Sequence, residues 1–376
     1  MDLETTTLTA YRFLHLMVGS LIVIELICLM SSRELVIETF EGRANRIPLY
    51  FLMADPVKEA AIGDIVGVRC WLEAFQPFLT KGGPFRRRGL SYREWSQQLD
   101  AKRCMWPDID HILREVDAAV SKVASTVKGK FLQAGIIGPT EYSEYSCSPG
   151  STKPGRHPDE VAHQFDFAVL TRIDSSKAEE IHRRFFEIVL EAVKRAANYD
   201  EIGSIRVADD FCDYRGSIYG RAFTDLILER QAKLSDAIKA GGKYAVLHAD
   251  GNIVPYLDRI SRAYDGVHPL DICSKSTLSA ALSWSSRLQE VRQAFPRTVF
   301  FTGIPIDLLC NSEISVADLM EVVKNVIRNV GSERLVLTTT HRPYPGWSFR
   351  DFEEKACALR RFIMNRDYSR KLNPTI

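Results

Sequence analysis

Five side chains that could bind a metal ion or transfer protons stand at the ends of apolar segments of strand length. These side chains are Asp209, Asp210, His248, Asp250 and His341. In parallel α/β proteins the carboxyl ends of the strands lie together and usually carry the chemistry. We therefore expect the five side chains to face one shared site.

The spacing His248-x-Asp250 places both side chains on the same side of an extended segment, as a chelating pair requires. With His341 they would form a set of two imidazoles and one carboxylate, a set that binds zinc or another divalent metal. Such an ion polarises a substrate carbonyl or carboxylate, or lowers the pKa of a bound water. The structural alternative is a hydrogen-bonded His248 and an Asp250 that only caps the helix expected after Asn252.

Asp209 and Asp210 are neighbours, so only one of them can point into the site while the strand continues. The other can act there if the strand has ended by that point. Adjacent carboxylates can separate their pKa values and supply an acid or a base. We assign Asp210, together with His341, to catalysis and Asp209 to substrate binding. The alternative is a structural ion pair with Arg206 or Arg215.

Other polar residues lie close to the strand ends. Residues predicted to contact the substrate are Tyr214, Arg215 and Tyr344. His268, which ends another strand just before a proline, is a further candidate ligand. His111 and His182 lie in expected helices, and we interpret them as surface residues.

The elements that must position these residues alternate between strands and helices. Expected strands cover 47–53, 130–137, 203–210, 244–247, 264–268, 298–302 and 334–341. Expected helices cover 33–40, 107–127, 176–199, 221–240, 254–262, 277–295, 315–331 and 348–365. Residues 55–100 are mixed, and 138–160, rich in Gly, Pro and Ser, are predicted to be irregular. This alternation indicates βα units, and a total of roughly eight strands favours a TIM barrel, (β/α)8.

Composition narrows the function further. The chain has 376 residues, 45% of them hydrophobic, and a formal net charge of +1, which gives no global field for binding nucleic acid. Its 8 cysteines form no CxxC pair, a pattern typical of reduced thiols in a cytoplasmic enzyme. Neither GxGxxG after the first strand nor GxxxxGK[ST] occurs, so the Rossmann and P-loop folds lose their main support. A small-molecule substrate is the expected partner.

The N-terminal segment, residues 1–32, is expected to be an apolar extension that precedes a barrel domain of residues 33–376. Residues 13–30 are mostly apolar, but His15 and Glu25 interrupt them, and a charge at mid-span is costly in a membrane. The segment fits a packed amphipathic helix, a membrane anchor or a non-native upstream extension, and the sequence leaves these three open.

Five sequence blocks resemble the uroporphyrinogen decarboxylase superfamily, which includes cobalamin-dependent methyltransferases. The blocks are FEGRANRIP (40–48), ADDFCDYRGS (208–217), ILERQAKL (227–234), GKYAVLHADGNI (242–253) and THRPYP (340–345). The similarity spans about residues 33–367 and implies a TIM barrel with its site at the carboxyl ends of the strands. It also implies a corrinoid methyl donor or a corrinoid protein as a candidate cofactor or partner.

The chain departs from both branches of this superfamily. The decarboxylases carry an arginine-rich motif after the first strand, where this chain reads FLMADP (51–56). The methyltransferase branch binds zinc through His-x-Cys and a later Cys, where this chain has His248-x-Asp250 and His341. His341 also matches a histidine that the decarboxylases place after the last strand. The activation of a thiol at a thiolate-rich zinc site, which belongs to the methyltransferase branch, is therefore not expected of this chain.

These residues favour a methyltransferase-like enzyme that acts on a small methylated or carboxylate-bearing substrate with divalent-metal assistance. The alternatives are a decarboxylase (a lyase) of a tetrapyrrole or another carboxylate, and a non-catalytic descendant that binds a corrinoid or tetrapyrrole.

Overall fold

Eight parallel strands form a nearly closed barrel in the computed structural model, which describes residues 31–80, 82–147, 165–344 and 347–365. Their order around the barrel is β1-β10-β9-β8-β7-β4-β3-β2. The strands are β1 (Leu49–Tyr50), β2 (Ile65–Arg69), β3 (Phe131–Ile137), β4 (Ile202–Ala208), β7 (Tyr244–His248), β8 (Gly266–His268), β9 (Val299–Ile304) and β10 (Leu335–Thr339). A short hairpin, β5 (Cys212–Asp213) with β6 (Gly216–Ser217), follows β4. The fold is the α/β TIM barrel that the sequence predicts.

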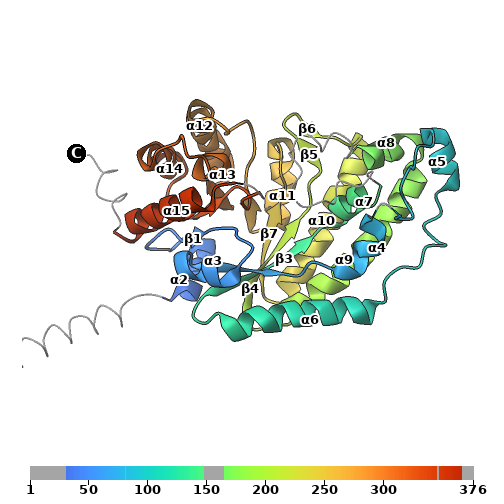
Figure 1. Ribbon diagram of the computed structural model, residues 1–376, viewed down its shortest axis with the longest axis horizontal. Helices are drawn as coiled ribbons and strands as arrows, with labels where there is room; N and C mark the ends of the chain where they lie inside the picture. The colour runs from blue at the N-terminus through green and yellow to red at the C-terminus, as the bar shows by residue number, and fades with distance from the viewer. Residues whose placement is uncertain (1–30, 81, 148–164, 345–346, 366–376) are drawn as a thin grey trace, which may run out of the picture.

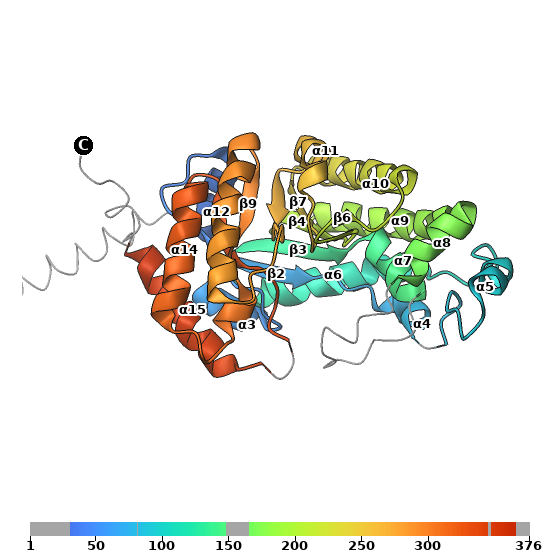
Figure 2. The ribbon, with the colours of Figure 1, turned by 90° about the horizontal axis from the view of Figure 1, so that it is seen from above.

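Helices surround the strands, with α6, α9 and α10 on one side and α12, α14 and α15 on the other (Figures 1 and 2). The longer helices are α2 (Ser32–Glu41), α6 (Ile109–Thr126), α9 (Ser175–Ala197), α10 (Arg221–Ala240), α12 (Leu278–Ala294), α14 (Val316–Val330) and α15 (Phe349–Met364). The shorter ones are α3 (Pro56–Ile62), α4 (Gln76–Leu79), α5 (Tyr92–Gln98), α7 (Pro139–Cys147), α8 (Asp166–Ile173), α11 (Leu257–Ala263) and α13 (Ile306–Leu309).

Helix α2 closes the amino end of the barrel. Ser31 and Glu34 form a capping box at its start, and Gly42 ends it with a φ of 74°, which favours glycine. Its Phe40 ring stacks on Tyr244 of β7 at a centroid distance of 4.1 Å. Phe40 and Val36 belong to a buried cluster with interior residues of the barrel. The cluster also contains Tyr50, Leu52, Ile65, Phe131, Val246, Val299, Phe301 and Val336.

Two carboxylates bridge the seam between β1 and β2, which form no ladder with each other in the described part of the chain. Glu59 of α3 accepts from Met53 N just after β1 at 2.8 Å and from Gly67 N of β2 at 2.6 Å. Asp64, just before β2, accepts from Leu49 N at 3.0 Å, while its own N–H donates to Leu49 O at 2.8 Å. Side chains thus replace part of the missing backbone pairing.

Most predicted elements are confirmed to within a few residues, but the segments without clear periodicity were misjudged. The mixed region 55–100 contains β2, α3 and α5, and the segment predicted to be irregular contains α7. The first predicted strand, 47–53, is reduced to Leu49–Tyr50. Residues 1–30, and with them most of the predicted apolar extension, lie outside the described residues.

Among the described residues, no helix is both long enough and apolar enough to cross a membrane.

Candidate active site

The ligand atoms of Asp210, His248 and Asp250 all lie within 4.8 Å of one another at the carboxyl end of the barrel. Strands β4 and β7 are neighbours, and Ala208 is paired with His248 in their register. Asp210 therefore follows β4 just where Asp250 follows β7, and Asp250 N donates to Asp210 Oδ1 at 2.7 Å. The sheet order brings the three side chains together.

The distances within this group fit an ion better than direct hydrogen bonds. His248 Nε2 lies 3.8 Å from Asp250 Oδ1 and 4.0 Å from Asp210 Oδ1. Both distances are too long for a hydrogen bond. Two atoms that each lie about 2.0–2.2 Å from one ion stand up to about 4.4 Å apart. Asp250 Oδ1 is also buried without a hydrogen-bond partner among the described residues, a costly state that a cation would relieve.

His248 is held in the tautomer that a ligand needs. His268 Nε2 lies 3.0 Å from the carbonyl oxygen of Thr339, which can only accept, so this nitrogen carries the proton. In a neutral His268 the other nitrogen, Nδ1, must then accept, and it lies 2.5 Å from His248 Nδ1. His248 therefore donates through Nδ1 and keeps a lone pair on Nε2, the atom that faces the two aspartates. His268, a predicted candidate ligand, orients a ligand instead.

Burial and neighbouring charges shift the pKa values of His248 and Asp210 in opposite directions. Burial, followed by the charges of Arg206 and His341, lowers the pKa of His248 well below its usual value and keeps the imidazole neutral. Burial raises the pKa of Asp210, and the neighbouring carboxylates of Asp250 and Glu141 raise it further.

Glu141 of α7 is a further buried carboxyl, whose charge interacts with those of Asp210 and Asp250, and the sequence did not reveal it. Its side chain is almost fully buried, and it accepts a short hydrogen bond from Tyr145 one helical turn later. Burial raises its pKa above the usual range, and the charges of Asp209 and Asp250 add to that shift. A carboxyl of this kind holds its proton near neutral pH. The signal for it was hidden because α7 itself was predicted to be irregular.

Asp209 points away from the site, as the alternation of neighbouring side chains requires. It is fully buried, and its oxygens accept from Thr140 Oγ1 at 2.7 Å, from Glu141 N at 2.9 Å and from Gln231 Nε2 at 2.5 Å. Burial raises its pKa to about 7 despite these donors. Its contacts fasten α7 and α10 to the end of β4, so its predicted substrate contact has no support from its position.

His341 and Tyr344 lie at the same end of the barrel but outside the group of three. Their rings stack at 4.5 Å, and His341 Nδ1 lies 2.8 Å from the carbonyl oxygen of Arg342. Between β10, which His341 follows, and β7 stand β8 and β9. Burial, then the charges of Asp250, Asp307 and Asp210, raises the pKa of Tyr344 to about 12. The metal and catalytic roles predicted for His341 stay predictions.

Tyr214 and Arg215 form the tip of the β5–β6 hairpin and are mostly exposed. Arg215 pairs with Asp213 at 3.1 Å. No ion pair joins Asp209 or Asp210 to Arg206 or Arg215 in the described part of the chain, so the structural alternative for the two aspartates has no support.

The two histidines predicted to lie on the surface differ in burial. His111 of α6 is exposed, with a side-chain exposure of 56%. His182 of α9 is fully buried, so its assignment to the surface was wrong. It lies 3.0 Å from Thr140 Oγ1 and 2.7 Å from Arg230 Nη1, and it packs on Phe167 and Phe223. Its helical position could not reveal that α7 and α10 cover this face of α9.

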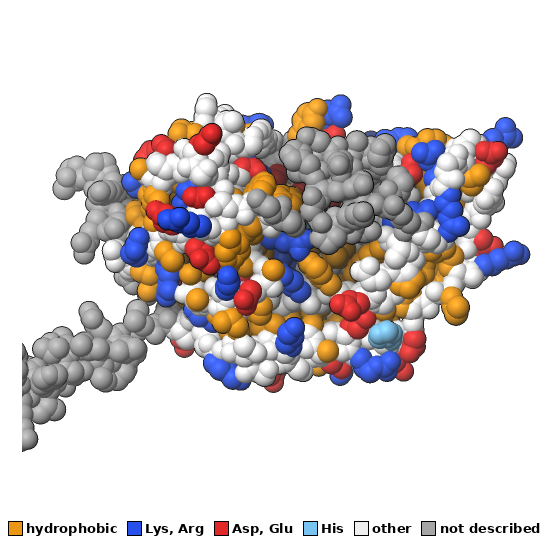
Figure 3. All heavy atoms as spheres, in the orientation of Figure 1, with side chains coloured by type: hydrophobic (Ala, Val, Ile, Leu, Met, Phe, Trp, Pro, Cys, Tyr) orange, Lys and Arg blue, Asp and Glu red, His pale blue; other side chains and the backbone are white. Residues whose placement is uncertain are grey.

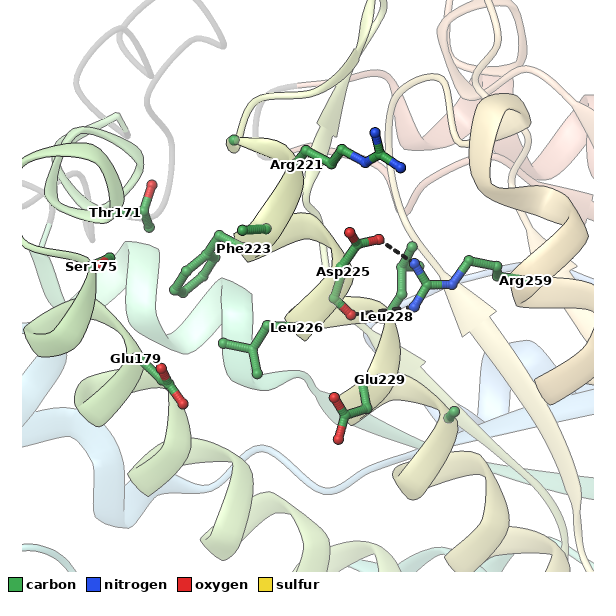
Figure 4. A pocket seen from close by; sticks show the side chains of 13 residues that line it. Thr171, Ser175, Glu179, Arg221, Phe223, Asp225, Leu226, Leu228, Glu229 and Arg259 are labelled. Atoms are coloured by element: carbon green, nitrogen blue, oxygen red, sulfur yellow. Dashed lines mark hydrogen bonds and ion pairs between the residues drawn. The ribbon is translucent and has the colours of Figure 1, made fainter.

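A cavity of about 860 Å³ lies on the outer side of the helical ring (Figure 4). Its lining comes from α8 to α11 and the turn before α10, and it includes Glu179, Phe223, Leu226 and Glu229. Asp225 and Arg259 pair at its edge. None of the residues that line it belongs to the group of three at the barrel end, so this cavity is separate from the candidate active site.

Comparison with known proteins supports the fold. No protein-family model and no curated protein sequence matches this chain. Among solved structures, it is similar to a methyltransferase from Methanosarcina mazei, with 13% identity and a TM-score of 0.55, over 90% of this chain and 100% of that chain. It is also similar to an endo-1,4-beta-D-mannanase from Thermotoga petrophila RKU-1, with 9% identity and a TM-score of 0.43, over 84% and 99% of the two chains. The first similarity shows a shared barrel fold. The second is too weak to support a conclusion.

Proposed function

We propose that this chain is a barrel enzyme that binds a divalent metal ion through Asp210, His248 and Asp250 and transfers a methyl group to or from a small substrate. The observation that carries the metal site is the meeting of these three ligand atoms within 4.8 Å. The support for methyl transfer is the resemblance of the HADGN block to the methyltransferase branch. The fold shared with a methyltransferase is compatible with it.

The ligand set predicts a particular chemistry. One imidazole and two carboxylates form a harder set than the His-x-Cys pattern, and they suit zinc, manganese or iron(II) rather than a metal selected by thiolates. When bound, such an ion supplies Lewis acidity to an oxygen or nitrogen of the substrate. The substrate atom that gives or receives the methyl group is therefore expected to be oxygen or nitrogen.

The residues of the chain would handle the substrate and its protons. His268 and the Thr339 carbonyl hold His248 in place. In methyl transfer the bond pair stays on the donor atom, and a lone pair of the acceptor forms the new bond to carbon. When the substrate oxygen or nitrogen gives up the methyl group, Glu141, a buried carboxyl whose charge interacts with that of Asp250, can donate a proton to that atom as its charge develops. When the substrate atom receives the methyl group, the carboxylate form of Glu141 can take the proton that this atom loses.

Decarboxylation is a second candidate, favoured specifically by Glu141. When the bond to a carboxylate breaks, carbon dioxide leaves and the electron pair stays on carbon. A protonated carboxyl at the site can deliver its proton to that carbon, and Glu141 is held in this state by burial and by neighbouring carboxylates. This reaction needs no corrinoid methyl donor.

The metal site can be tested on the purified full chain by elemental analysis. Wild-type protein should bind about one equivalent of zinc or manganese, and His248→Ala and Asp210→Asn should lose it, since removing one of three ligands leaves an incomplete set. Asp250→Cys should keep zinc, because a thiolate is a good zinc ligand. His111→Ala, an exposed histidine of α6, is the matched control and should change nothing. Wild-type binding that His248→Ala does not alter would reject the site.

The reaction is tested by supplying methylcobalamin with small hydroxyl or amine acceptors and following the loss of its methyl–cobalt absorption. In parallel, release of carbon dioxide from small carboxylates tests the second candidate. Methyl transfer that requires His248 and the added metal supports the proposal. Carbon dioxide release that survives metal removal but not Glu141→Gln would replace it with the decarboxylase.

A further inference from the structure

Arg206 stands inside the barrel, below the candidate metal site. It lies on β4, on the interior face that also carries Ser204, two residues earlier, and Asp210, just past the strand end. Its guanidinium carbon lies 5.8 Å from the ring centre of Tyr50, a member of the interior cluster. On β3, Gly135 is paired with Arg206, and a Cβ there would lie 3.5 Å from Arg206 Nη2. The missing side chain at Gly135 leaves the guanidinium room.

In the described part of the chain, no carboxylate forms an ion pair with this guanidinium. Its Nε and Nη1 are buried and have no hydrogen-bond partner among the described residues. The charge of Arg206 acts on Glu59, but the Glu59 carboxylate already accepts from Met53 N and Gly67 N and lies 3.6 Å from Arg69. A buried cation without a partner is costly, so a ligand that supplies the partner would bind favourably there.

Charges of opposite sign occupy different parts of the barrel end. Asp210, Asp250 and Glu141 are close enough for their charges to interact. Arg206 and Arg69 belong to the interior faces of β4 and β2, and their charges act on Tyr50 and Glu59. The charge of Arg206 also reaches His248 and His268. A substrate held between these regions would meet cations at one end and the metal ligands at the other.

We infer that Arg206 binds a carboxylate of the substrate, so that the reacting end of the same molecule lies against Asp210, His248 and Asp250. This inference rests on the proposed function because it names the substrate class of that site. The planar fork of a guanidinium matches the two oxygens of a carboxylate. A single negative charge also balances the one uncompensated guanidinium, whereas a dianionic phosphate would leave excess negative charge beside Glu59.

The test is calorimetric titration of the full chain with propionate, with methylphosphonate and with neutral propionamide. Wild-type protein should bind propionate, and Arg206→Met should weaken that binding about tenfold to a hundredfold, the range for a charged hydrogen-bonded pair. Arg206→Lys keeps the charge but loses the fork, so its affinity should fall between the two. Arg287→Met, an exposed arginine of α12, is the matched control and should bind as wild type does.

A stability measurement separates a ligand-binding arginine from a structural one. Arg206→Met should unfold at or above the wild-type temperature, since it removes an uncompensated buried charge. Propionate should raise the unfolding temperature of wild-type protein and leave that of Arg206→Met unchanged. If Arg206→Met does not fold, Arg206 is structural and the inference fails.

The expected binding of propionate by Arg206 does not depend on the metal. Wild-type protein freed of metal by a chelator is expected to bind propionate as the metal-loaded protein does. Loss of propionate binding on removal of the metal would place the carboxylate on the metal and overturn the role of Arg206. Equal binding of propionamide, preference for methylphosphonate, or unchanged binding by Arg206→Met would overturn it as well. Failure of metal binding with intact propionate binding would reject the proposed function and leave the carboxylate site standing.

Discussion

At the scale of single residues, the orientation of His248 depends on a neighbour that is not itself a ligand. The rings of His248 and His268 lie 4.8 Å apart, and the Thr339 carbonyl sets the tautomer of the pair. A ligand whose second nitrogen is held in this way loses little freedom on binding a metal. Burial lowers the pKa of both histidines, so the pair remains neutral beside two aspartates.

We predict that His268→Phe lowers metal affinity about 10–100-fold without abolishing binding, the usual effect of removing a residue that orients a ligand. Phenylalanine keeps the ring shape but offers no acceptor to His248 Nδ1. Competition with a chelator of known affinity measures the change. Unchanged affinity would show that His248 is oriented by packing alone, and thermal unfolding of the variant controls for loss of the fold.

At the scale of elements, the barrel closes through side chains where β1 and β2 lack a ladder. Asp64 is the centre of one bridge: Arg46 donates to both of its oxygens at 2.8 and 2.9 Å, and Ser32 of α2 donates at 3.1 Å. Burial acts to raise the pKa of Asp64, but the hydrogen-bonded Arg46 outweighs it and leaves the pKa below its usual value. One carboxylate thereby connects α2, β1 and β2.

The lowered pKa of Asp64 determines how its contribution to stability changes with pH. Because the folded-state pKa of Asp64 is depressed, its contribution to stability is present above the unfolded-state value of about 3.9 and is lost as the pH falls through the folded-state value. Asp64→Asn should lower the free energy of unfolding at pH 7 by about 3 kcal/mol, since it leaves Arg46 without its partner.

Denaturant unfolding at several pH values measures both effects of Asp64→Asn. The difference from wild type should shrink at the acidic end of the series. A constant difference across the series would show that hydrogen-bond geometry, and not charge, makes the bridge.

At the scale of the whole molecule, the barrel depends on a helix that comes before its first strand. Phe40 and Val36 of α2 cover the interior side chains at the amino end of the barrel. The opposite end carries the candidate site. On the face shown in Figure 3, acidic and basic side chains are interspersed rather than gathered by sign. Charges of one sign are therefore gathered inside the barrel rather than on this face.

This arrangement predicts where the chain can be shortened. A chain that begins at Met30 keeps Ser31, the cap of α2, and should unfold cooperatively and keep its metal affinity. A chain that begins at Gly42 loses Val36 and Phe40 and should be destabilised by at least about 3–5 kcal/mol, the usual cost of emptying one aromatic core position. Thermal unfolding of the two chains checks this. Loss of cooperative unfolding in the longer chain would show that residues before Met30 belong to the fold.

The fold class, most element boundaries and the strand ends that carry Asp210, His248, Asp250 and His341 could be predicted from the sequence. Apolar periodicity, caps such as Ser315 and stops such as Gly42 and Gly331 are local signals, so they can be read without the fold. The missed element β2 and helix α7 lie where that periodicity is weak.

Which of these side chains meet depends on the order of the strands around the barrel, which the sequence does not reveal. Strands β4 and β7 are adjacent in the barrel, which joins Asp210 to His248 and Asp250, while β8 and β9 separate His341 from them. The burial of His182 also depends on contacts with residues distant along the chain. So does the unpaired state of Arg206. Periodicity indicates which face of an element is apolar, but not which other element covers that face. The covering element supplies the hydrogen-bond partners and the counter-charges, so these cannot be predicted from periodicity.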